Sequence, residues 1–192
     1  MNWKRLSIVL LCLCGLLTLS DVLLLKQNVQ MRRKLPVAPT ALKAGVLLMP
    51  FSARGLTNQK IDVQYDGTGP RRVYFYFTSA CDFCRKQFPY WKQILSLSDS
   101  RNLEAIGLVK DSENEAELRQ FLTQMGCSPD SEKPLKVAFI SDDVRRNYGL
   151  SATPVTLVAD NRGAVEKSWL GAWNDAERVD ALTMLKLPIP TH

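Results

Sequence analysis

The residues best suited to chemistry are two cysteines in the stretch Cys81-Asp82-Phe83-Cys84. The apolar run 73–77 precedes them and predicts a buried strand, and the residues after Cys81 have the pattern of a helix. A helix N-terminus carries roughly half a positive charge and free N–H groups, which stabilise a thiolate and lower the pKa of its cysteine. Cys84 lies one helical turn further on and can close a disulfide with Cys81. The spacing therefore indicates a dithiol that alternates between reduced and oxidised forms.

Composition excludes several kinds of chemistry that depend on histidine. The chain has 192 residues and five cysteines, and its one histidine is the last residue, His192. This excludes a histidine-based triad and a multi-histidine metal site, and Arg85 after Cys84 excludes the haem attachment pattern CxxCH. An inert disulfide and half of a zinc site are the alternative interpretations of the pair, but zinc needs four ligands. We expect no metal and no cofactor.

The other three cysteines do not suggest a disulfide scaffold. Cys12 and Cys14 lie in an apolar run and are interpreted as small hydrophobic residues. Cys127 stands alone, either as a buried or loop thiol or with a regulatory or resolving role.

Residues 1–35 are predicted to form an N-terminal membrane anchor with a juxtamembrane helix. The run 6–25 is apolar except for small polar residues and Asp21, and about 20 residues of helix span a hydrocarbon core. A cleaved signal peptide is the alternative, but the apolar run continues past Asp21 and no A-x-A site ends it. Six of the 25 basic residues lie in this segment with one acidic residue, so the remainder is nearly neutral. Nucleic-acid binding is therefore not expected.

The rest of the chain has the pattern of one α/β domain. Residues 36–45 are interpreted as a linker, residues 46–192 as the domain, and residues 51–66 as a β-hairpin or a pair of short strands. Strands joined by helices run parallel, and the last two strands form an antiparallel hairpin across Asp160–Gly163, which predicts a mixed sheet with helices on both faces. The expected strands are 73–77, 103–109, 136–140, 155–159 and 164–170, and the expected helices are 82–97, 112–125, 142–148 and 174–186.

This pattern resembles the TlpA/ResA-like thiol-disulfide oxidoreductases, which are membrane-anchored redoxins of thioredoxin-like fold. The resemblance covers roughly residues 45–186. It rests on the strand before Cys81, the Phe88-Pro89 pair, Thr153-Pro154 at the entry to a strand, and the hairpin that ends at Gly171. It implies a thioredoxin-like fold in which a helix–strand unit, about 113–140, is an insertion.

The resemblance also implies a substrate-binding role for Thr153 and Pro154. A cis bond between them would turn the backbone groups of Thr153 outward beside the cysteines, where a substrate polypeptide can pair as an extra strand. The expected chemistry is thiol–disulfide exchange, in which Cys81 attacks and Cys84 resolves the mixed disulfide. Asp82 and Phe83 are expected to tune the redox potential. Asp82 disfavours a nearby thiolate, which favours a reductase.

Two positions depart from the relatives. Plain thioredoxins carry a buried aspartate where this chain has Phe75, and ResA-like proteins carry an acid where this chain has Gln87. Either another acid, with Asp82 and Glu104 as candidates, or a water molecule must move protons to the resolving thiol. We also expect Trp173 near the site.

The expected partners follow from the same resemblance. They are protein thiols and disulfides, among them components of cytochrome c maturation, a membrane electron donor that reduces the pair again, and the lipid bilayer around residues 6–25. The expected location is the bacterial inner membrane, crossed once, with the domain in the periplasm as for a signal anchor. The basic residues that flank the run, counted alone, favour the opposite orientation.

Two other functions stay open. One is a peroxiredoxin-like peroxide reductase with antioxidant activity. The stretch Thr78–Cys81 fits its T-x-x-C pattern, although Tyr74 stands where a proline is expected. The other is a tethered interaction module that keeps the fold but turns over poorly, which the missing carboxylates favour.

Overall fold

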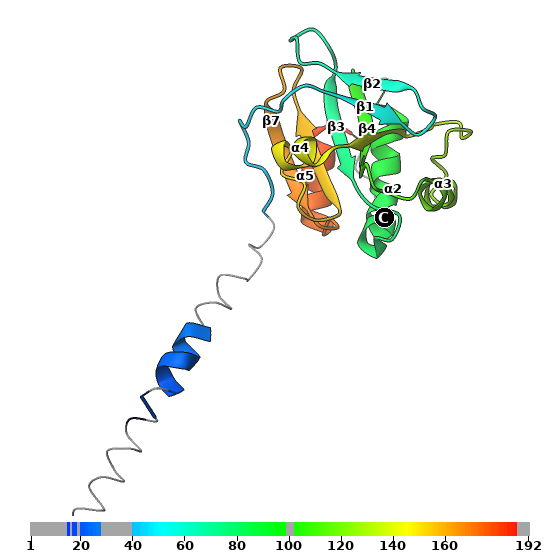
Figure 1. The fold of residues 1–192 in the computed structure, drawn as a ribbon. Helices are drawn as coiled ribbons and strands as arrows, with labels where there is room; N and C mark the ends of the chain where they lie inside the picture. The colour runs from blue at the N-terminus through cyan, green and yellow to red at the C-terminus, as the bar shows by residue number, and fades with distance from the viewer. Residues whose placement is uncertain (1–14, 16, 19, 28–39, 99–101, 188–192) are drawn as a thin grey trace, which may run out of the picture. The chain divides into compact units, whose positions relative to one another are not determined.

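The computed structural model describes residues 15, 17–18, 20–27, 40–98 and 102–187. The chain divides into two units, Met1–Ala38 and Pro39–His192, drawn in Figure 1. In the first unit, residues 20–27 are helical and exposed. Among the described residues, no helix is long and apolar enough to cross a membrane. Most of the predicted anchor and residues 36–39 of the predicted linker lie outside the described residues.

The described part of the second unit forms a seven-stranded mixed sheet in the order β2-β1-β5-β4-β3-β6-β7 (Figure 1). Neighbouring strands of the β3, β4 and β5 group run parallel, and β6 and β7 continue the sheet antiparallel beside β3. The hairpin of β1 and β2 lies at the other edge, antiparallel to β5. The strands are β1 (Phe51–Gly55), β2 (Lys60–Val63), β3 (Arg71–Tyr76), β4 (Leu103–Lys110), β5 (Lys136–Ile140), β6 (Val155–Ala159) and β7 (Val165–Leu170).

The helices begin after residues whose side chains accept hydrogen bonds from the free N–H groups of the first turn. Asn114 accepts from the backbone of Ala116 and Glu117, and Asn174 forms a reciprocal capping box with Glu177. They are α2 (Asp82–Leu97), α3 (Glu115–Gln124), α4 (Asp142–Asn147) and α5 (Asp175–Met184). The predicted helices are confirmed: α2 has its predicted bounds, and the ends of the others move by at most three residues.

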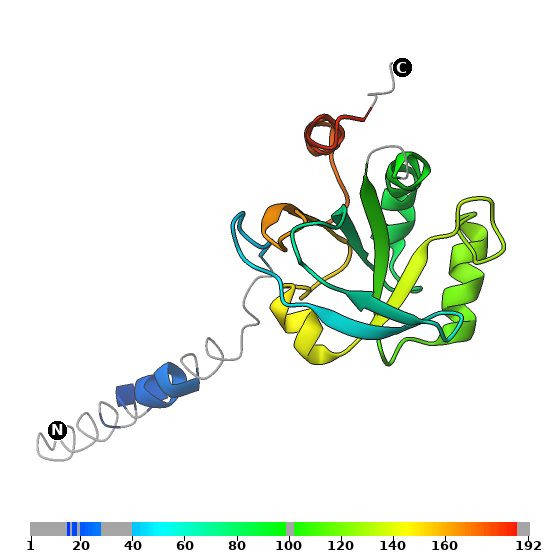
Figure 2. The ribbon, with the colours of Figure 1, turned by 90° about the horizontal axis from the view of Figure 1, so that it is seen from above.

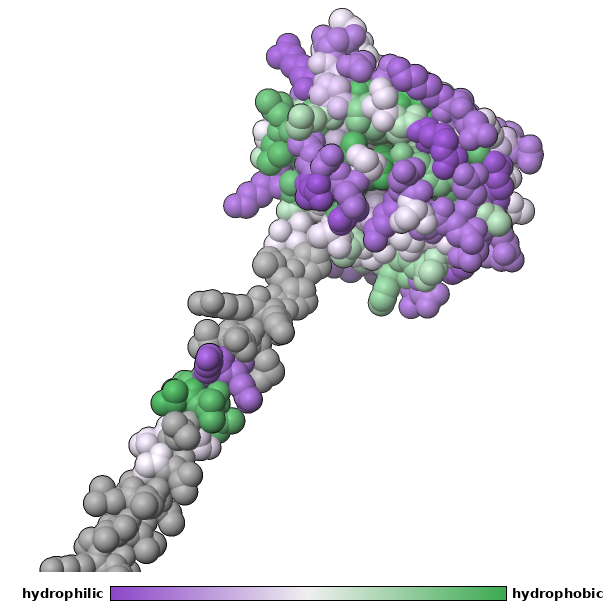
Figure 3. Space-filling view, in the orientation of Figure 1, coloured by the Kyte–Doolittle hydropathy of each residue, from purple (hydrophilic) through white to green (hydrophobic). Residues whose placement is uncertain are grey.

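The sheet separates two apolar layers, as predicted. Helices α2, α3 and α5 pack on one face in a layer that contains Phe75, Phe77, Trp91 and Phe121. The other face is covered by α4 and the chain before β1 in a layer that contains Tyr74 and many aliphatic side chains (Figure 2). Polar residues cover most of the surface shown in Figure 3. Strand β3 is buried on both faces along most of its length, and it leads directly to the cysteines.

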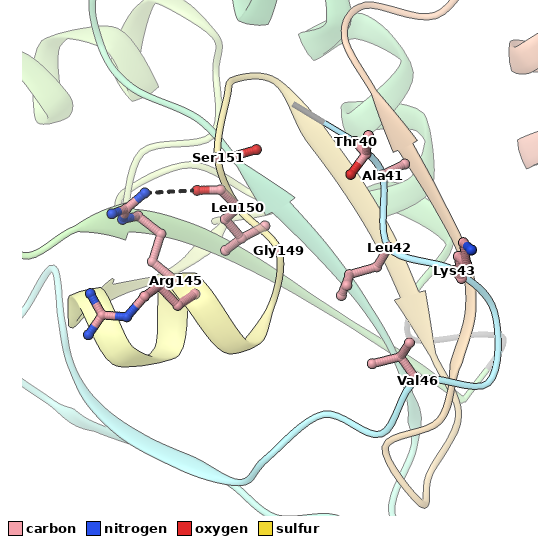
Figure 4. A pocket seen from close by; sticks show the side chains of 10 residues that line it. Thr40, Ala41, Leu42, Lys43, Val46, Arg145, Gly149, Leu150 and Ser151 are labelled. Carbon is pink, nitrogen blue, oxygen red and sulfur yellow. Dashed lines mark hydrogen bonds between the residues drawn. The ribbon is translucent and has the colours of Figure 1, made fainter. Parts of the chain in front are cut away.

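Residues 40–48 already belong to the folded unit. Backbone bonds join Gly45 N to Val165 O and Leu48 N to Gly163 O, both at 2.8 Å, and Leu47 forms an isolated antiparallel bridge with Ala164 just before β7. Residues 40–46 face α4 and residues 149–151 across a pocket (Figure 4). Gly149 has a φ of +61°, and a Cβ there would lie 2.7 Å from the Leu42 side chain. The close packing of Leu42 on the domain therefore depends on a glycine at position 149. The sequence places residues 40–45 in a linker, but the chain packs against the domain from there on.

Candidate active site

Cys81 and Cys84 form a disulfide with their Cα atoms 5.2 Å apart. Cys81 is the N-cap of α2, and its sulfur accepts a hydrogen bond of 3.0 Å from Cys84 N. Cys81 is half-buried, whereas Cys84 is fully buried. After reduction, the N–H group and the positive helix end favour a thiolate on Cys81. A substrate can therefore reach the sulfur of Cys81, whereas the buried sulfur of Cys84 can attack only that of Cys81.

Thr153 and Pro154 lie at the same end of the sheet as the cysteines. The bond between them is cis, as the resemblance implied. Strand β6 begins directly after Pro154 and pairs Val155 with Tyr76 at the end of β3. Pro154 is buried, and its carbonyl accepts from Gly171 N at 2.8 Å. The topology thus brings Thr153 and Pro154 together with the Cys81 turn, and their role in binding substrate stays a prediction.

The turn before Cys81 is held by two charged side chains that sequence reasoning missed. Glu113 Oε1 accepts from both the backbone N and the Oγ of Ser79, each at 2.7 Å. Arg85 Nη2 donates to the Ser79 carbonyl at 3.1 Å. Glu113 precedes α3, so the predicted insertion positions the reactive cysteine. No local pattern marks Glu113 for this role, because its partner lies 34 positions away.

The two positions that depart from relatives are both deeply buried. The Phe75 ring stacks on Trp91 with centroids 4.9 Å apart, so the underside of the site is apolar there. Gln87 lies one helical turn after Cys84, and its Oε1 accepts from Trp173 N at 2.8 Å. Among the described residues, neither Gln87 Nε2 nor Trp173 Nε1 has a hydrogen-bond partner. This contact places Trp173 beside the helix that carries the cysteines, as expected.

Of the two acids considered for proton transfer, Glu104 is excluded by its position. It pairs with Arg72 near the start of β3, four strand positions before Tyr76, which corresponds to about 13 Å. Burial raises the pKa of Glu104, but hydrogen bonds from Lys136 and Arg72 outweigh burial and leave the pKa below its usual value. Glu104 therefore joins strands at the end of the sheet remote from Cys81.

Asp82 and Phe83 face away from the protein between the two cysteines. Both are exposed, and the Phe83 side chain is 61% exposed with the Lys86 ammonium 5.5 Å from its ring centre. They are thus available to an approaching substrate as well as to the thiols. Their effect on the redox potential stays a prediction.

Cys127 does not take part in the pair. Its side chain is fully buried and its thiol is free. Burial raises the pKa of Cys127, and the nearby Lys92 opposes this only in part. A buried neutral thiol is a poor nucleophile, so the structure gives Cys127 a packing role in the layer beneath α2.

Comparisons with known proteins agree with this architecture. The model of the AhpC/TSA family matches residues 48–168. No curated protein matches the chain.

Solved structures with the same fold include a protein assigned as the thiol:disulfide interchange protein DsbE from Chlorobium tepidum, with 24% identity, 76% of this chain and 96% of that chain covered, and a TM-score of 0.60. The thioredoxin domain of a thiol-disulfide oxidoreductase from Bacteroides vulgatus has 15% identity, coverages of 75% and 99%, and a TM-score of 0.59. StoA from Bacillus subtilis has 15% identity, coverages of 72% and 98%, and a TM-score of 0.53. These likenesses confirm the thioredoxin-like fold.

Proposed function

Because the chain belongs to the AhpC/TSA family, and because a half-exposed and a buried cysteine share a disulfide at a helix N-terminus, we propose that it is a thiol-disulfide oxidoreductase. The carrying observation is the unequal burial of Cys81 and Cys84, since exchange needs one thiol that meets the substrate and one that meets only its partner.

The proposed reaction begins with the Cys81 thiolate. It attacks one sulfur of a substrate disulfide, forms a mixed disulfide, and releases the other substrate sulfur as a thiolate that takes a proton. Cys84 loses its proton and attacks the Cys81 sulfur. This forms the Cys81–Cys84 disulfide and releases the second substrate thiol. Two electrons pass from the dithiol to the substrate, and an external dithiol must return them.

The proposed direction is reduction of protein disulfides. Asp82, one position after Cys81, places a negative charge near the thiolate and makes the dithiol a better electron donor. The only histidine is residue 192, so the peptide between the cysteines contains no cation that would stabilise the reduced form.

The proposed setting is the periplasmic face of a bacterial inner membrane, with residues 6–25 as the anchor. The apolar run that continues past Asp21 supports this setting. The proposed partners are extracytoplasmic protein disulfides, including those of cytochrome c maturation, and a membrane electron donor. In bacterial cells we expect the full chain to stay with membranes after alkaline extraction, and Cys81 to react with a membrane-impermeant thiol reagent after reduction. Labelling only after lysis would contradict the orientation.

The exchange reaction is tested with the full chain in mild detergent. We expect it to accelerate insulin reduction by dithiothreitol, and we expect Cys81→Ser to remove the acceleration. The Cys84→Ser variant should trap a mixed disulfide with substrate, visible on a non-reducing gel, because its resolving thiol is missing. Equal rates for wild type and Cys81→Ser would refute thiol exchange and favour an interaction module.

Peroxide reduction remains the second candidate because of the family match. Against it, Tyr74, at the position where the peroxiredoxin pattern expects a proline, is fully buried, and its hydroxyl bonds Tyr65 at 2.6 Å. The Cys81–Cys84 spacing also suits exchange. Consumption of hydrogen peroxide by the reduced chain, faster than insulin reduction, would favour this candidate.

A further inference from the structure

A cavity opens beside the cysteine turn on the side of α3. It has a volume of about 240 Å³ and lies between the turn, the first residues of α2, and α3. Ala80, which is exposed and directly precedes Cys81, forms part of its wall. The cavity therefore lies next to the cysteine that a substrate disulfide must reach. The polar lining residues are Ser79, Arg85, Glu117, Gln120 and Gln124.

Arg85 is held in this cavity by neutral groups. Its Nη1 donates to Gln124 Oε1 at 2.8 Å, and its Nη2 donates to the Ser79 carbonyl at 3.1 Å. The guanidinium carbon lies 4.9 Å from the centre of the Phe121 ring. A guanidinium has five N–H donors, so these two bonds leave donors for a ligand.

The charge of Arg85 lacks a paired carboxylate among the described residues. Arg54 and Arg72, by contrast, each contact a glutamate. Glu113 directs its Oε1 to Ser79, and Glu117, on the rim of the cavity, accepts from Asn114 at 3.3 Å. A cation that is fixed in place, half-buried and unpaired favours an anionic ligand.

We propose that this cavity is a substrate subsite for a carboxylate side chain next to the substrate's disulfide cysteine, and that Arg85 is its specificity-determining residue. The proposal rests on the thiol-exchange function proposed above. A carboxylate can take two parallel N–H bonds from a guanidinium, which orients the substrate chain as well as attracting it. Glu117, on the rim of the same cavity, repels an acidic side chain and therefore weakens the preference that Arg85 creates.

The test uses the full chain in mild detergent, reduced and freed of reductant, in single-turnover exchange with short peptides closed by one disulfide. The peptides differ only in carrying glutamate, glutamine or lysine next to the cysteine. We expect the glutamate peptide to react about 3- to 5-fold faster than the glutamine peptide at low salt, with the ratio falling toward one at high salt. The lysine peptide should be the slowest of the three.

Variants separate charge from architecture. In Arg85→Gln, the exchange rates of the glutamate and glutamine peptides should become about equal. Arg85→Lys should retain most of the wild-type ratio of these two rates, and Glu117→Gln should increase the ratio. The matched control is Lys86→Gln, which removes a neighbouring positive charge that does not line the cavity and should leave the ratio unchanged. An equal ratio in wild type and Arg85→Gln, or a wild-type ratio of one, overturns the proposal.

A binding measurement distinguishes failure of the subsite from failure of the exchange function. The chain with both Cys81→Ser and Cys84→Ser is titrated with the reduced, fluorescently labelled peptides, and anisotropy is recorded. Tighter binding of the glutamate peptide that disappears with Arg85→Gln supports the subsite even if no peptide undergoes exchange, in which case the proposed function fails alone. Equal binding of the three peptides overturns the subsite even if exchange is rapid.

Discussion

At the residue scale, the departures from the relatives have structural consequences that residue type alone does not predict. Gln87 is fully buried and fixes the chain after Gly171 by accepting from Trp173 N. It thus ties α2 to the segment between β7 and α5. Its amide nitrogen, one turn from Cys84, faces the interior without a partner among the described residues. A carboxylate here would keep the bond to Trp173 and add a titrating group beside the resolving thiol.

We therefore predict that one substitution of Gln87 affects stability and another affects the pH dependence of exchange. Gln87→Ala leaves the buried Trp173 N–H unpaired and should lower the free energy of unfolding by about 1–3 kcal/mol. Gln87→Glu keeps the acceptor, and burial raises the pKa of a carboxyl group, so the pH profile of the exchange rate should gain an inflection beyond the one that the Cys81 thiol gives in wild type. The measurements are urea unfolding and the pH profile of single-turnover exchange. Superimposable pH profiles of wild type and Gln87→Glu would show that a carboxyl group at position 87 does not affect the reaction of Cys84.

Also at the residue scale, the sequence identifies Cys81, Cys84, Thr153 and Pro154 because their types and spacing are sufficient. It cannot identify Arg85 or Glu113, because their roles depend on partners on another element. Glu104 shows that the sequence can also suggest a residue wrongly. Its residue type makes it a candidate for proton transfer, but the strand register places it at the end of the sheet remote from Cys81.

At the element scale, the strands and helices near the site follow directly from the sequence. Helix α2 has the bounds predicted for it, because Cys81 caps its first turn and its apolar residues recur at helical spacing. Strand β5 likewise has its predicted bounds. The sequence pattern could not predict that β5 lies between β4 and β1, because pairing between residues distant in the sequence determines the strand order. The insertion consequently places α3 next to the cysteine turn.

Three central strands are joined at the opposite end of the sheet by Glu104. Its two oxygens accept from Arg72 on β3 at 2.8 Å and from Lys136 on β5 at 2.6 Å. The Arg72 side chain is only 9% exposed, so loss of its partner leaves a largely buried cation. In Glu104→Gln, either orientation of the amide directs an NH₂ group at one of the two cations.

We predict that Glu104→Gln lowers the free energy of unfolding by about 2 kcal/mol at neutral pH. Because the folded-state pKa of Glu104 is below its ordinary value of 4.5, the stabilisation is fully present above that value and is lost as pH falls through the lower folded-state pKa. The difference between wild type and variant should therefore shrink below about pH 4.5. Urea unfolding at pH 3 to 8 measures it. Asp143→Asn, which removes an exposed partner of Arg146, is the control and should change little. A pH-independent difference would contradict the argument.

At the scale of the whole molecule, the sequence predicts one α/β domain but misplaces where its packing begins. Residues 40–45 have no periodic pattern and lie after prolines, which is typical of a linker. Their backbone nevertheless pairs with the start of β7, and Tyr148 donates to the carbonyl of Met49 at 3.1 Å. Backbone pairing at a sheet edge needs no side-chain pattern, so the sequence alone could not show it.

The docked segment offers a pair of adjacent leucines as a test. Leu48 is 4% exposed and packs in the layer with Tyr148, whereas Leu47 is 67% exposed. We predict that Leu48→Ala lowers the free energy of unfolding of the full chain by about 2–4 kcal/mol, because it removes a buried side chain and leaves a cavity. Leu47→Ala should change it by less than about 0.5 kcal/mol. Urea unfolding followed by tryptophan fluorescence measures both. Equal, small effects would contradict a contribution of Leu48 to the packed layer. A large effect of Leu48→Ala alone would establish that the folded unit begins before β1.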